Sequence, residues 1–307
     1  MSIKVEDISK FYGSQEALSH INFEAKKGDI IGFLGPNGAG KSTMMKILTG
    51  YISASSGKAS VAGYDVEEHD IEVKKRIGYL PEHNSLYTDM YVKEYLNFVA
   101  GIYKIKNKKA RIAEMIQLVK LDIEQHKKIE ELSKGYRQRV GLAAAMIHDP
   151  EVLILDEPTT GLDPNQLSEI RSLIMRIGEE KTVLLSTHIM QEVEAMCTRV
   201  IIIDQGKIIA DKPTKELKRG LSEHDLLEIE FEKEIDLALF KKSFPDILVE
   251  HKGKGHYRLL NKTGKDIRAE LFDWAVKNQT SILGQKAIET NLEEVFKQLT
   301  VKNDNTL

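Results

Sequence analysis

A run of eight residues has the composition of a loop that binds phosphate groups. Residues 35–42 read Gly-Pro-Asn-Gly-Ala-Gly-Lys-Ser and match the pattern G-x-x-x-x-G-K-[ST] without a gap. A loop that wraps a triphosphate must aim successive backbone N–H groups inward, and glycine reaches the required conformations without a Cβ clash. Lys41 supplies a positive charge for the β- and γ-phosphates, and the Ser42 hydroxyl is a ligand for Mg²⁺. The run therefore predicts binding of a nucleoside triphosphate together with Mg²⁺.

Two carboxylates follow an apolar segment further along the chain. Val152–Leu155 reads as a buried strand, and Asp156 and Glu157 come directly after it. A buried strand would hold Asp156 within reach of Mg²⁺, and Glu157 would polarise a water molecule for attack on phosphate. The alternative is a core strand that simply ends in acidic residues. The phosphate loop upstream favours the catalytic interpretation.

A second anion site is indicated at residues 132–139. Ser133 and Gly135 come just before a helix through Val140–Ile147, and a helix N-terminus offers unpaired N–H groups to an anion. One chain has no evident use for two triphosphate sites. Two chains arranged head to tail would each supply Ser133 to the γ-phosphate bound by the other. An ordinary helix cap at Ser133 is the alternative.

His188 follows the predicted strand Thr182–Leu185. Open α/β sheets contact their ligands at the carboxyl ends of their strands, so a polar side chain at this place is a candidate for ligand binding. A single histidine is more often structural. We expect the strand to lie beside the one that ends at Asp156, which favours a role for His188 at the γ-phosphate.

The elements that must position these residues alternate between strand and helix up to about Leu217. The phosphate loop lies between a buried strand, Ile30–Leu34, and a helix, Ser42–Leu48. Further strands are predicted at Ile3–Val5, Ile21–Glu24, Ile77–Leu80 and Val200–Asp204, and helices at Asn165–Ile177 and Ile189–Ala195. This alternation predicts an α/β fold with a parallel sheet wrapped by helices.

Between Ser85 and about Met146 the strand signals stop, which predicts a helical insertion over about residues 85–146. Tyr91, Tyr95 and Phe98 fall on one helix face, and we expect them to form the core of the insertion rather than a docking surface. Tyr87 is the better candidate for contact with a partner.

After Gly220 the pattern changes to that of a small α+β domain. The predicted order is strand Leu226–Phe231, helix Ile235–Phe244, strands Ile247–Glu250 and His256–Leu260, helix Ile267–Lys277, strand Ile282–Ile288 and helix Leu292–Leu299. The order βαββαβ is typical of the split-βαβ plan. We therefore expect one domain over residues 1–218 and a second over residues 222–307.

Length and composition limit the class of protein. A chain of 307 residues with 41% apolar and 30% charged residues has the composition of a soluble globular protein of one large or two unequal domains. Its single cysteine, Cys197, excludes an intrachain disulfide, and the net charge of −3 argues against a general nucleic-acid surface. No signal peptide or membrane span is predicted, so a membrane role would require a partner.

These motifs together resemble the ATP-binding subunit of ABC transporters over residues 1 to about 217. The resemblance implies a P-loop NTPase fold with a mixed sheet core, the helical insertion and an ATPase activity. It assigns Lys41 and Ser42 to Walker A, Asp156 and Glu157 to Walker B, Ser133 and Gly135 to the signature motif, and His188 to the switch histidine. Residues 161–163 resemble the D-loop. The residues expected to bind ATP are Tyr12, Gly35, Pro36, Asn37, Gly38, Ala39, Gly40, Lys41, Ser42, Thr43, Ser133 and Gly135.

The chain departs from the family pattern at two places. Glu82 stands where the Q-loop usually has glutamine, and a carboxylate there would ligate Mg²⁺ with Ser42 and Asp156. A solvated loop carboxylate is the alternative, as a surface aromatic is for Tyr12. Lys134 and Tyr136 replace the common signature residues, a variant that resembles ABC-2-type transporters. The C-terminal segment, with residues 291–296, resembles a domain appended to ABC-2-type ATPases. Residues 78–84 and the overall layout resemble ATPase subunits linked to bacterial gliding motility.

The resemblance implies a homodimer or heterodimer of ATPase subunits that binds a separate polytopic permease on the inner, cytoplasmic face of the cell membrane. Glu157, His188 and Lys41 would be the catalytic residues, ATP and Mg²⁺ the cofactors, and no nucleic acid is expected. The main alternative is a soluble ABC ATPase that acts on ribosomes or DNA. A GTPase is disfavoured because residues 261–264, Asn-Lys-Thr-Gly, lack the carboxylate that guanine selection requires.

Overall fold

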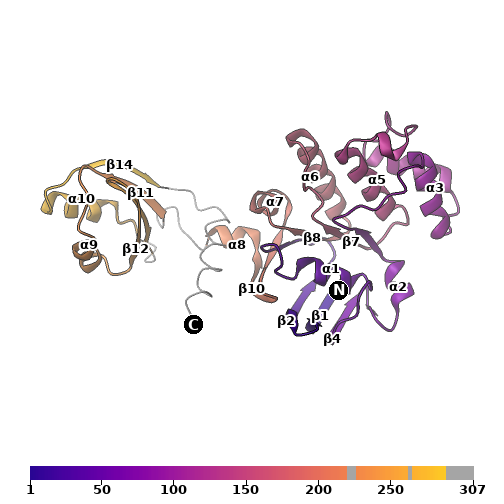
Figure 1. Cartoon of the computed structure of the whole chain (residues 1–307), viewed down its shortest axis with the longest axis horizontal. Helices are drawn as coiled ribbons and strands as arrows, with labels where there is room; N and C mark the ends of the chain where they lie inside the picture. The colour runs from indigo at the N-terminus through magenta and orange to yellow at the C-terminus, as the bar shows by residue number, and fades with distance from the viewer. Residues whose placement is uncertain (220–225, 262–264, 288–307) are drawn as a thin grey trace. The chain divides into compact units, whose positions relative to one another are not determined.

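A computed structural model describes residues 1–219, 226–261 and 265–287 (Figure 1). The chain divides into two compact units, Met1–Thr214 and Lys215–Leu307. The limits expected from the sequence for the two domains, 1–218 and 222–307, stay predictions. Within the described ranges, no helix combines the length and the apolar character needed to cross a membrane.

The first unit is built around a six-stranded sheet with the strand order β10-β9-β3-β8-β7-β6. The strands are β3 (Ile30–Leu34), β6 (Ile77–Leu80), β7 (Val152–Asp156), β8 (Thr182–Thr187), β9 (Arg199–Asp204) and β10 (Lys207–Pro213). Neighbouring strands are parallel except for β10, which pairs with β9 in the antiparallel sense. Every residue of β3, β7 and β8 is buried, as their continuous apolar runs predict.

A second, antiparallel sheet has the order β2-β1-β4-β5. Its strands are β1 (Ile3–Tyr12), β2 (Gln15–Ala25), β4 (Ser56–Val61) and β5 (Tyr64–Asp65). The expectation of one parallel sheet that includes Ile3–Val5 and Ile21–Glu24 was wrong. Only two residues, Gly13 and Ser14, join β1 to β2, and so short a connection permits only an antiparallel pair. Strand β4 was missed because it begins with polar residues.

Helix α1 (Lys41–Leu48) lies between the two sheets (Figure 1). Its buried side chains Met44, Met45, Ile47 and Leu48 belong to one apolar cluster with residues of both sheets. This packing holds the helix N-terminus beside the carboxyl end of β3. The first unit also contains α2 (Asp70–Lys74), α6 (Pro164–Gly178) and α7 (Met190–Met196), and α8 (Thr214–Arg219) begins at its last residue.

The segment between β6 and β7 is helical, with α3 (Val92–Ile102), α4 (Lys108–Leu118), a short 3₁₀ turn at Ile129–Glu131 and α5 (Lys134–Met146). The buried face of α3 consists of Val92, Leu96 and Ala100. The prediction that Tyr91, Tyr95 and Phe98 form the core was therefore wrong: Tyr91 is 48% and Phe98 42% exposed. The aromatic ring of Tyr87 contacts the rings of Tyr95 and Phe98 edge-on, at centroid distances of 6.1 and 5.6 Å.

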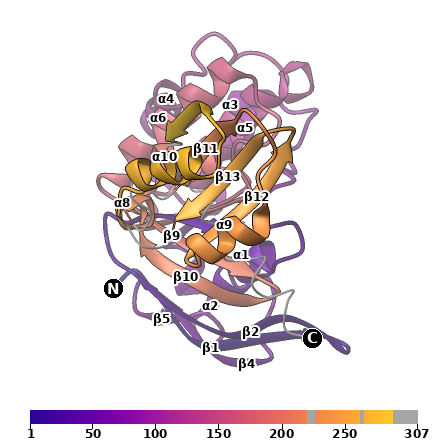
Figure 2. The same ribbon diagram turned by 90° about the vertical axis from the view of Figure 1, so that its left-hand side faces the viewer.

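The described residues from 226 to 287 form a four-stranded antiparallel sheet with helices α9 and α10 on the same face, as Figure 2 shows. Its elements are β11 (Leu226–Phe231), α9 (Leu237–Ser243), β12 (Ile247–Gly253), β13 (His256–Asn261), α10 (Arg268–Lys277) and β14 (Ile282–Ala287), with the strand order β12-β13-β11-β14. Phe231, Phe240, Leu271 and Trp274 pack in its core. The predicted βαββαβ order is confirmed. The predicted helix Leu292–Leu299 lies outside the described residues.

Strand β6 approaches helix α5 closely at Gly78. A Cβ atom at this position would lie 2.2 Å from the backbone oxygen of Ala145, so any side chain must push the helix away. We expect Gly78→Ala to lower the free energy of unfolding by about 1–3 kcal/mol. Urea denaturation of the two proteins would measure the change.

Gly101→Ala is the matched control, because a Cβ there would meet only the flexible end of Lys108 at 3.3 Å. Alanine favours helix over glycine, so this variant should be as stable as the parent or about 0.5–1 kcal/mol more stable. A Gly78→Ala variant with the parent's stability would contradict the close approach.

Candidate functional site

The phosphate loop connects β3 to α1 and depends on its glycines. Gly38 has φ 83° and Gly40 has φ 107°, in the left-handed region that side chains rarely adopt. A Cβ atom on Gly40 would also lie 2.7 Å from the backbone oxygen of Ala17. Helix α1 begins directly after Gly40, so its free N–H groups face the loop. The loop therefore has the geometry that the sequence pattern indicates for anion binding.

Lys41 extends back into this loop. Its ammonium group donates hydrogen bonds to the backbone oxygens of Gly35 at 2.9 Å and Pro36 at 3.2 Å. The same nitrogen lies 3.7 Å from Oε1 of Glu157, and both side chains are almost fully buried, 6% and 7% exposed. The positive charge is thus held at the centre of the loop, where the phosphates of a nucleotide would replace weaker carbonyl contacts.

Asp156 lies at the end of β7 beside the Ser42 hydroxyl. Its Oδ1 accepts hydrogen bonds from Ser42 Oγ at 3.2 Å and from Ser186 Oγ at 2.5 Å. A hydroxyl and a carboxylate are the hard oxygen ligands that Mg²⁺ prefers, and Mg²⁺ completes its shell with water and phosphate oxygens. In the described residues no group of three or more His, Cys, Asp or Glu is arranged as a metal cage. The donor set fits a nucleotide-bound Mg²⁺.

Glu157 is held in an unusual conformation. Its φ of 50° is left-handed, and its N–H donates to Ser186 Oγ at 3.0 Å. Its two carboxylate oxygens each lie 3.0 Å from Nδ1 of His188, and Oε2 accepts a hydrogen bond from the Thr160 hydroxyl at 3.0 Å. A non-glycine residue in this region is strained, and such strain is common where a side chain must be aimed at a reaction centre.

These groups meet at one cavity of about 330 Å³. Its lining residues are Asn37, Gly38, Lys41, Ser42, Glu82, Glu157, Thr160 and His188. The tertiary structure thus brings together residues from four separate segments of the chain. Glu82 lines the cavity together with residues of the phosphate loop.

Eight of the twelve residues expected to bind ATP do not line this cavity: five belong to the phosphate loop or follow it directly, and Tyr12, Ser133 and Gly135 come from other segments. Ser133 caps α5 and accepts a hydrogen bond from Tyr136 N at 3.4 Å. Gly135 was expected to precede the helix but lies in its first turn, where a Cβ would come within 2.2 Å of Gln166 Oε1. Tyr12, at the end of β1, is 49% exposed, and Lys10 Nζ lies 5.4 Å from its ring centre.

Three hydroxyl residues were missed as candidates. Thr160 contacts Glu157, Ser186 bridges Asp156 to the backbone of Glu157, and Thr187 ends β8 beside His188. The available signal was their position directly after or at the carboxyl ends of β7 and β8, which is where such sheets place their ligand contacts.

Comparison with known proteins agrees with this geometry. Residues 18–160 match the family described as ABC transporter. The bacitracin transport ATP-binding protein BcrA of Bacillus licheniformis is 35% identical over 97% of this chain and 96% of its own length. The linearmycin resistance ATP-binding protein LnrL of Bacillus subtilis is 31% identical over 97% of this chain and 98% of its own.

Solved structures resemble the first unit. An ATP-binding subunit of an ABC transporter matches with a TM-score of 0.66 and 27% identity over 71% of this chain and 92% of that one. A dimeric bacterial ABC transporter cassette matches with a TM-score of 0.63 and 25% identity over 69% and 98%. The chain belongs to the family of ABC transporter ATP-binding subunits, and it is an ATPase.

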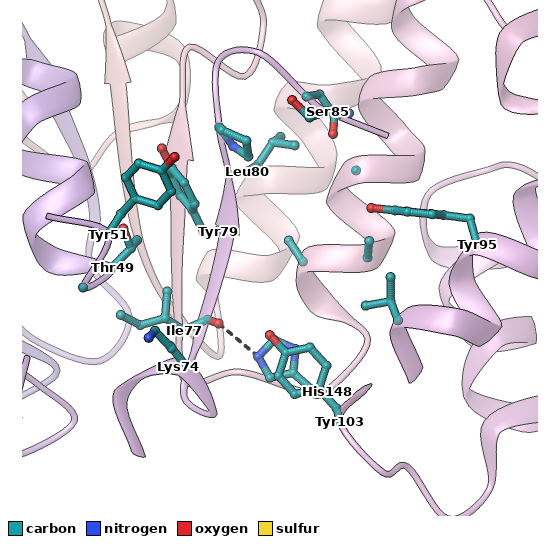
Figure 3. A pocket seen from close by; sticks show the side chains of 17 residues that line it. Thr49, Tyr51, Lys74, Ile77, Tyr79, Leu80, Ser85, Tyr95, Tyr103 and His148 are labelled. Atoms are coloured by element: carbon teal, nitrogen blue, oxygen red, sulfur yellow. Dashed lines mark hydrogen bonds between the residues drawn. The ribbon is translucent and has the colours of Figure 1, made fainter. Parts of the chain in front are cut away.

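A second cavity, of about 480 Å³, lies between the sheet and the helical insertion (Figure 3). We call it the interface groove, and its lining residues are Thr49, Gly50, Tyr51, Lys74, Ile77, Tyr79, Leu80, Pro81, Asn84, Ser85, Tyr95, Val99, Tyr103, Gly141, Ala144, Ala145 and His148. Figure 3 shows Tyr51 and Tyr79 on one side and Tyr95, Tyr103 and His148 on the other. The groove is rich in aromatic rings and separate from the phosphate loop.

His148 is uncharged at the floor of this groove. Its ring stacks on Tyr103 at 3.8 Å, and Nε2 lies 3.0 Å from the backbone oxygen of Ile77. Burial lowers the pKa of His148 from 6.5 to about 4, and the hydrogen bond to Ile77 only partly opposes this. The neutral ring therefore donates Nε2–H to Ile77 at neutral pH.

This histidine should make stability depend on pH. The unfolded chain takes up a proton near pH 6.5 and the folded chain only near pH 4, so falling pH favours unfolding between these values. Between these pH values His148 should account for a loss of roughly 2 kcal/mol in the free energy of unfolding. Partial exposure of the ring makes this loss smaller than the full pKa difference would give. His148→Phe keeps the stacking, and its unfolding free energy should fall less steeply from pH 6.5 to 4. Urea denaturation at several pH values would measure it.

The control is the same substitution at exposed His126, which should leave the pH dependence unchanged. His148→Phe removes the donor to Ile77, so an equal loss of stability at every pH is expected in addition. Parallel curves for the parent and His148→Phe would contradict the assignment.

Proposed function

We propose that this chain hydrolyses ATP as one of two ATPase subunits that power export through a separate membrane permease. One observation supports assigning the ATPase activity to particular residues. Five side chains lie together at one cavity or its edge: Lys41, Ser42, Asp156, Glu157 and His188. Each has a chemical group that phosphoryl transfer to water requires.

In this proposal the residues act mainly by position and charge. Lys41 would exchange its carbonyl contacts for the β- and γ-phosphates. Ser42 and Asp156 would hold Mg²⁺, and Glu82, which lines the same cavity, would be a further ligand. The metal, when bound, supplies positive charge to the phosphates. Glu157 accepts the proton of the attacking water, and His188 holds Glu157 and the γ-phosphate in line.

A second copy or a close relative would complete the site. Ser133 caps α5 but does not line the cavity of its own chain, so its hydroxyl and the helix N-terminus are available to a nucleotide held by a partner. A dimeric cassette among the structural neighbours supports this arrangement. Tyr12, with its exposed ring, would stack on the adenine.

Export is supported by the names of two relatives, a bacitracin transport protein and a linearmycin resistance protein. Since both align over nearly the whole chain, we propose an export function here as well, on the inner face of the membrane. The ABC-2 subtype and a role in gliding motility have only the sequence resemblance as support. We propose that the interface groove receives an amphipathic segment of the permease, since its aromatic lining is separate from the nucleotide cavity.

Glu157→Gln should bind ATP but hydrolyse it about 10²- to 10⁴-fold more slowly, because the amide cannot accept a proton from water. The closed pair of subunits should then accumulate with ATP. Lys41→Ala should instead lose affinity for ATP. Phosphate release, fluorescent-nucleotide titration and light scattering measure these three quantities.

Glu151→Gln and Lys46→Ala are the matched controls, because Glu151 lies just before β7 and Lys46 in the last turn of α1. Both should behave like the parent. A Glu157→Gln variant that turns over at the parent's rate would exclude Glu157 as the base.

The permease proposal predicts that a polytopic membrane protein co-purifies with the tagged chain from native membranes in mild detergent. Tyr51→Glu, which places a charge at an exposed ring of the groove, should abolish that recovery with ATPase activity retained. Ile123→Glu, at an exposed residue outside the groove, should not. Mass spectrometry identifies the partner, and recovery of ribosomal or DNA-bound proteins instead would favour the soluble alternative.

A further inference from the structure

The turn that carries His188 is held by two fully buried polar side chains. Thr187, the last residue of β8, and Glu192, in the first turn of α7, are both 0% exposed. The Thr187 hydroxyl donates to Glu192 Oε2 at 2.8 Å and accepts a hydrogen bond from the N–H of Ile189 at 3.0 Å. Since Ile189 follows His188 directly, the hydroxyl of Thr187 fixes the backbone on the C-terminal side of His188.

The backbone of Thr187 holds the turn from the other direction. Its carbonyl oxygen accepts a hydrogen bond from Gly35 N, the first residue of the phosphate loop, at 3.4 Å. Ile189, the cap residue of α7, has no side-chain hydrogen bond that caps the helix. The Thr187 hydroxyl instead holds the N–H of that cap residue, so this one residue joins the phosphate loop, the His188 turn and the segment that leads into α7.

Glu192 is costly for the fold. Its Oε1 has no hydrogen-bond partner in the described part of the chain, and a buried polar atom without a partner destabilises a protein. An apolar side chain of similar size would fill the same space without this cost. A purely structural requirement at this position therefore does not favour a carboxyl group, whereas a fixed acceptor for the Thr187 hydroxyl does.

We propose that Thr187 and Glu192 are positioning residues for hydrolysis. They hold the His188 turn so that Nδ1 stays 3.0 Å from both carboxylate oxygens of Glu157. Neither residue lines the nucleotide cavity, so their effect passes through His188. The inference rests on the proposed role of His188 in hydrolysis.

Substitution of Thr187 distinguishes a role in positioning His188 from a role in folding alone. Thr187→Val keeps the shape and removes the hydroxyl, and it should lower kcat for ATP about tenfold or more with KM within about twofold of the parent. Thr187→Ser retains the hydroxyl and should restore most of the rate. Thr182→Val is the control, because Thr182 is equally buried at the other end of β8 and donates to Lys26 O at 3.0 Å. It should leave kcat unchanged.

Substitution of Glu192 tests the role of its carboxylate, whose Oε1 has no hydrogen-bond partner among the described residues. Glu192→Leu removes the unpaired oxygen but leaves the Thr187 hydroxyl without its acceptor, so its stability in urea denaturation should stay close to that of the parent. Its kcat should nevertheless be lowered to a similar degree as in Thr187→Val. Glu192→Gln keeps an acceptor oxygen and should retain most of the activity. A fall in kcat without a fall in stability is a result that a purely structural role does not produce.

A readout independent of turnover distinguishes this inference from the proposed role of His188. In ¹⁵N-histidine NMR spectra, the His188 signal, assigned with His188→Gln, should shift or broaden in Thr187→Val and Glu192→Leu but not in Thr182→Val. If that shift occurs while His188→Gln keeps the parent's kcat, the positioning holds and the catalytic role fails. Unchanged His188 signals and an unchanged kcat in both variants would overturn the inference.

Discussion

Parallel pairing of β3, β8 and β7 is the constraint on which the site depends. The register sets Leu34 against Thr187 and Asp156 against Ser186, so the phosphate loop, His188 and the two carboxylates all begin at one edge of the sheet. Residues more than a hundred positions apart in the chain thereby come within hydrogen-bond distance. The pairing is stable because every residue of these strands is buried, with α1 packed between this sheet and the antiparallel one.

Polar groups at that edge interact with one another, and Lys41, Asp156 and Glu157 among them are buried. Asp156 accepts from two hydroxyls, and Glu157 is held by Thr160, His188 and the ammonium group of Lys41. A buried charge that loses its partner is costly, so these contacts keep the proposed catalytic groups together at the cavity. In the proposed mechanism, phosphate oxygens would replace the carbonyl contacts of Lys41 without disturbing the strands, because the loop rather than the sheet carries those contacts.

The loop after β6 connects the nucleotide cavity to the interface groove. Glu82 lines the nucleotide cavity, whereas Leu80, Pro81, Asn84 and Ser85 line the interface groove. Asn84 also donates to the backbone oxygen of Arg137 at 2.8 Å, and its amide fills the space beside Gly141 in helix α5. Movement of a partner in the groove would therefore act on Glu82 and on the helix capped by Ser133 through one short segment, which gives ATP turnover a physical route to the proposed permease.

The sequence by itself determined the chemistry and the buried strands, because a phosphate loop has an exacting local composition and a core strand is a continuous apolar run. It also determined the βαββαβ order of the second unit, whose elements are short and separated by recognisable turn residues. The tertiary structure alone decided the separate antiparallel sheet, the exposed aromatic face of α3 and the hydrogen bonds of Thr160, Ser186 and Thr187. Pairing partners and hydrogen bonds between distant segments depend on which surfaces meet, and a local residue pattern does not contain that information.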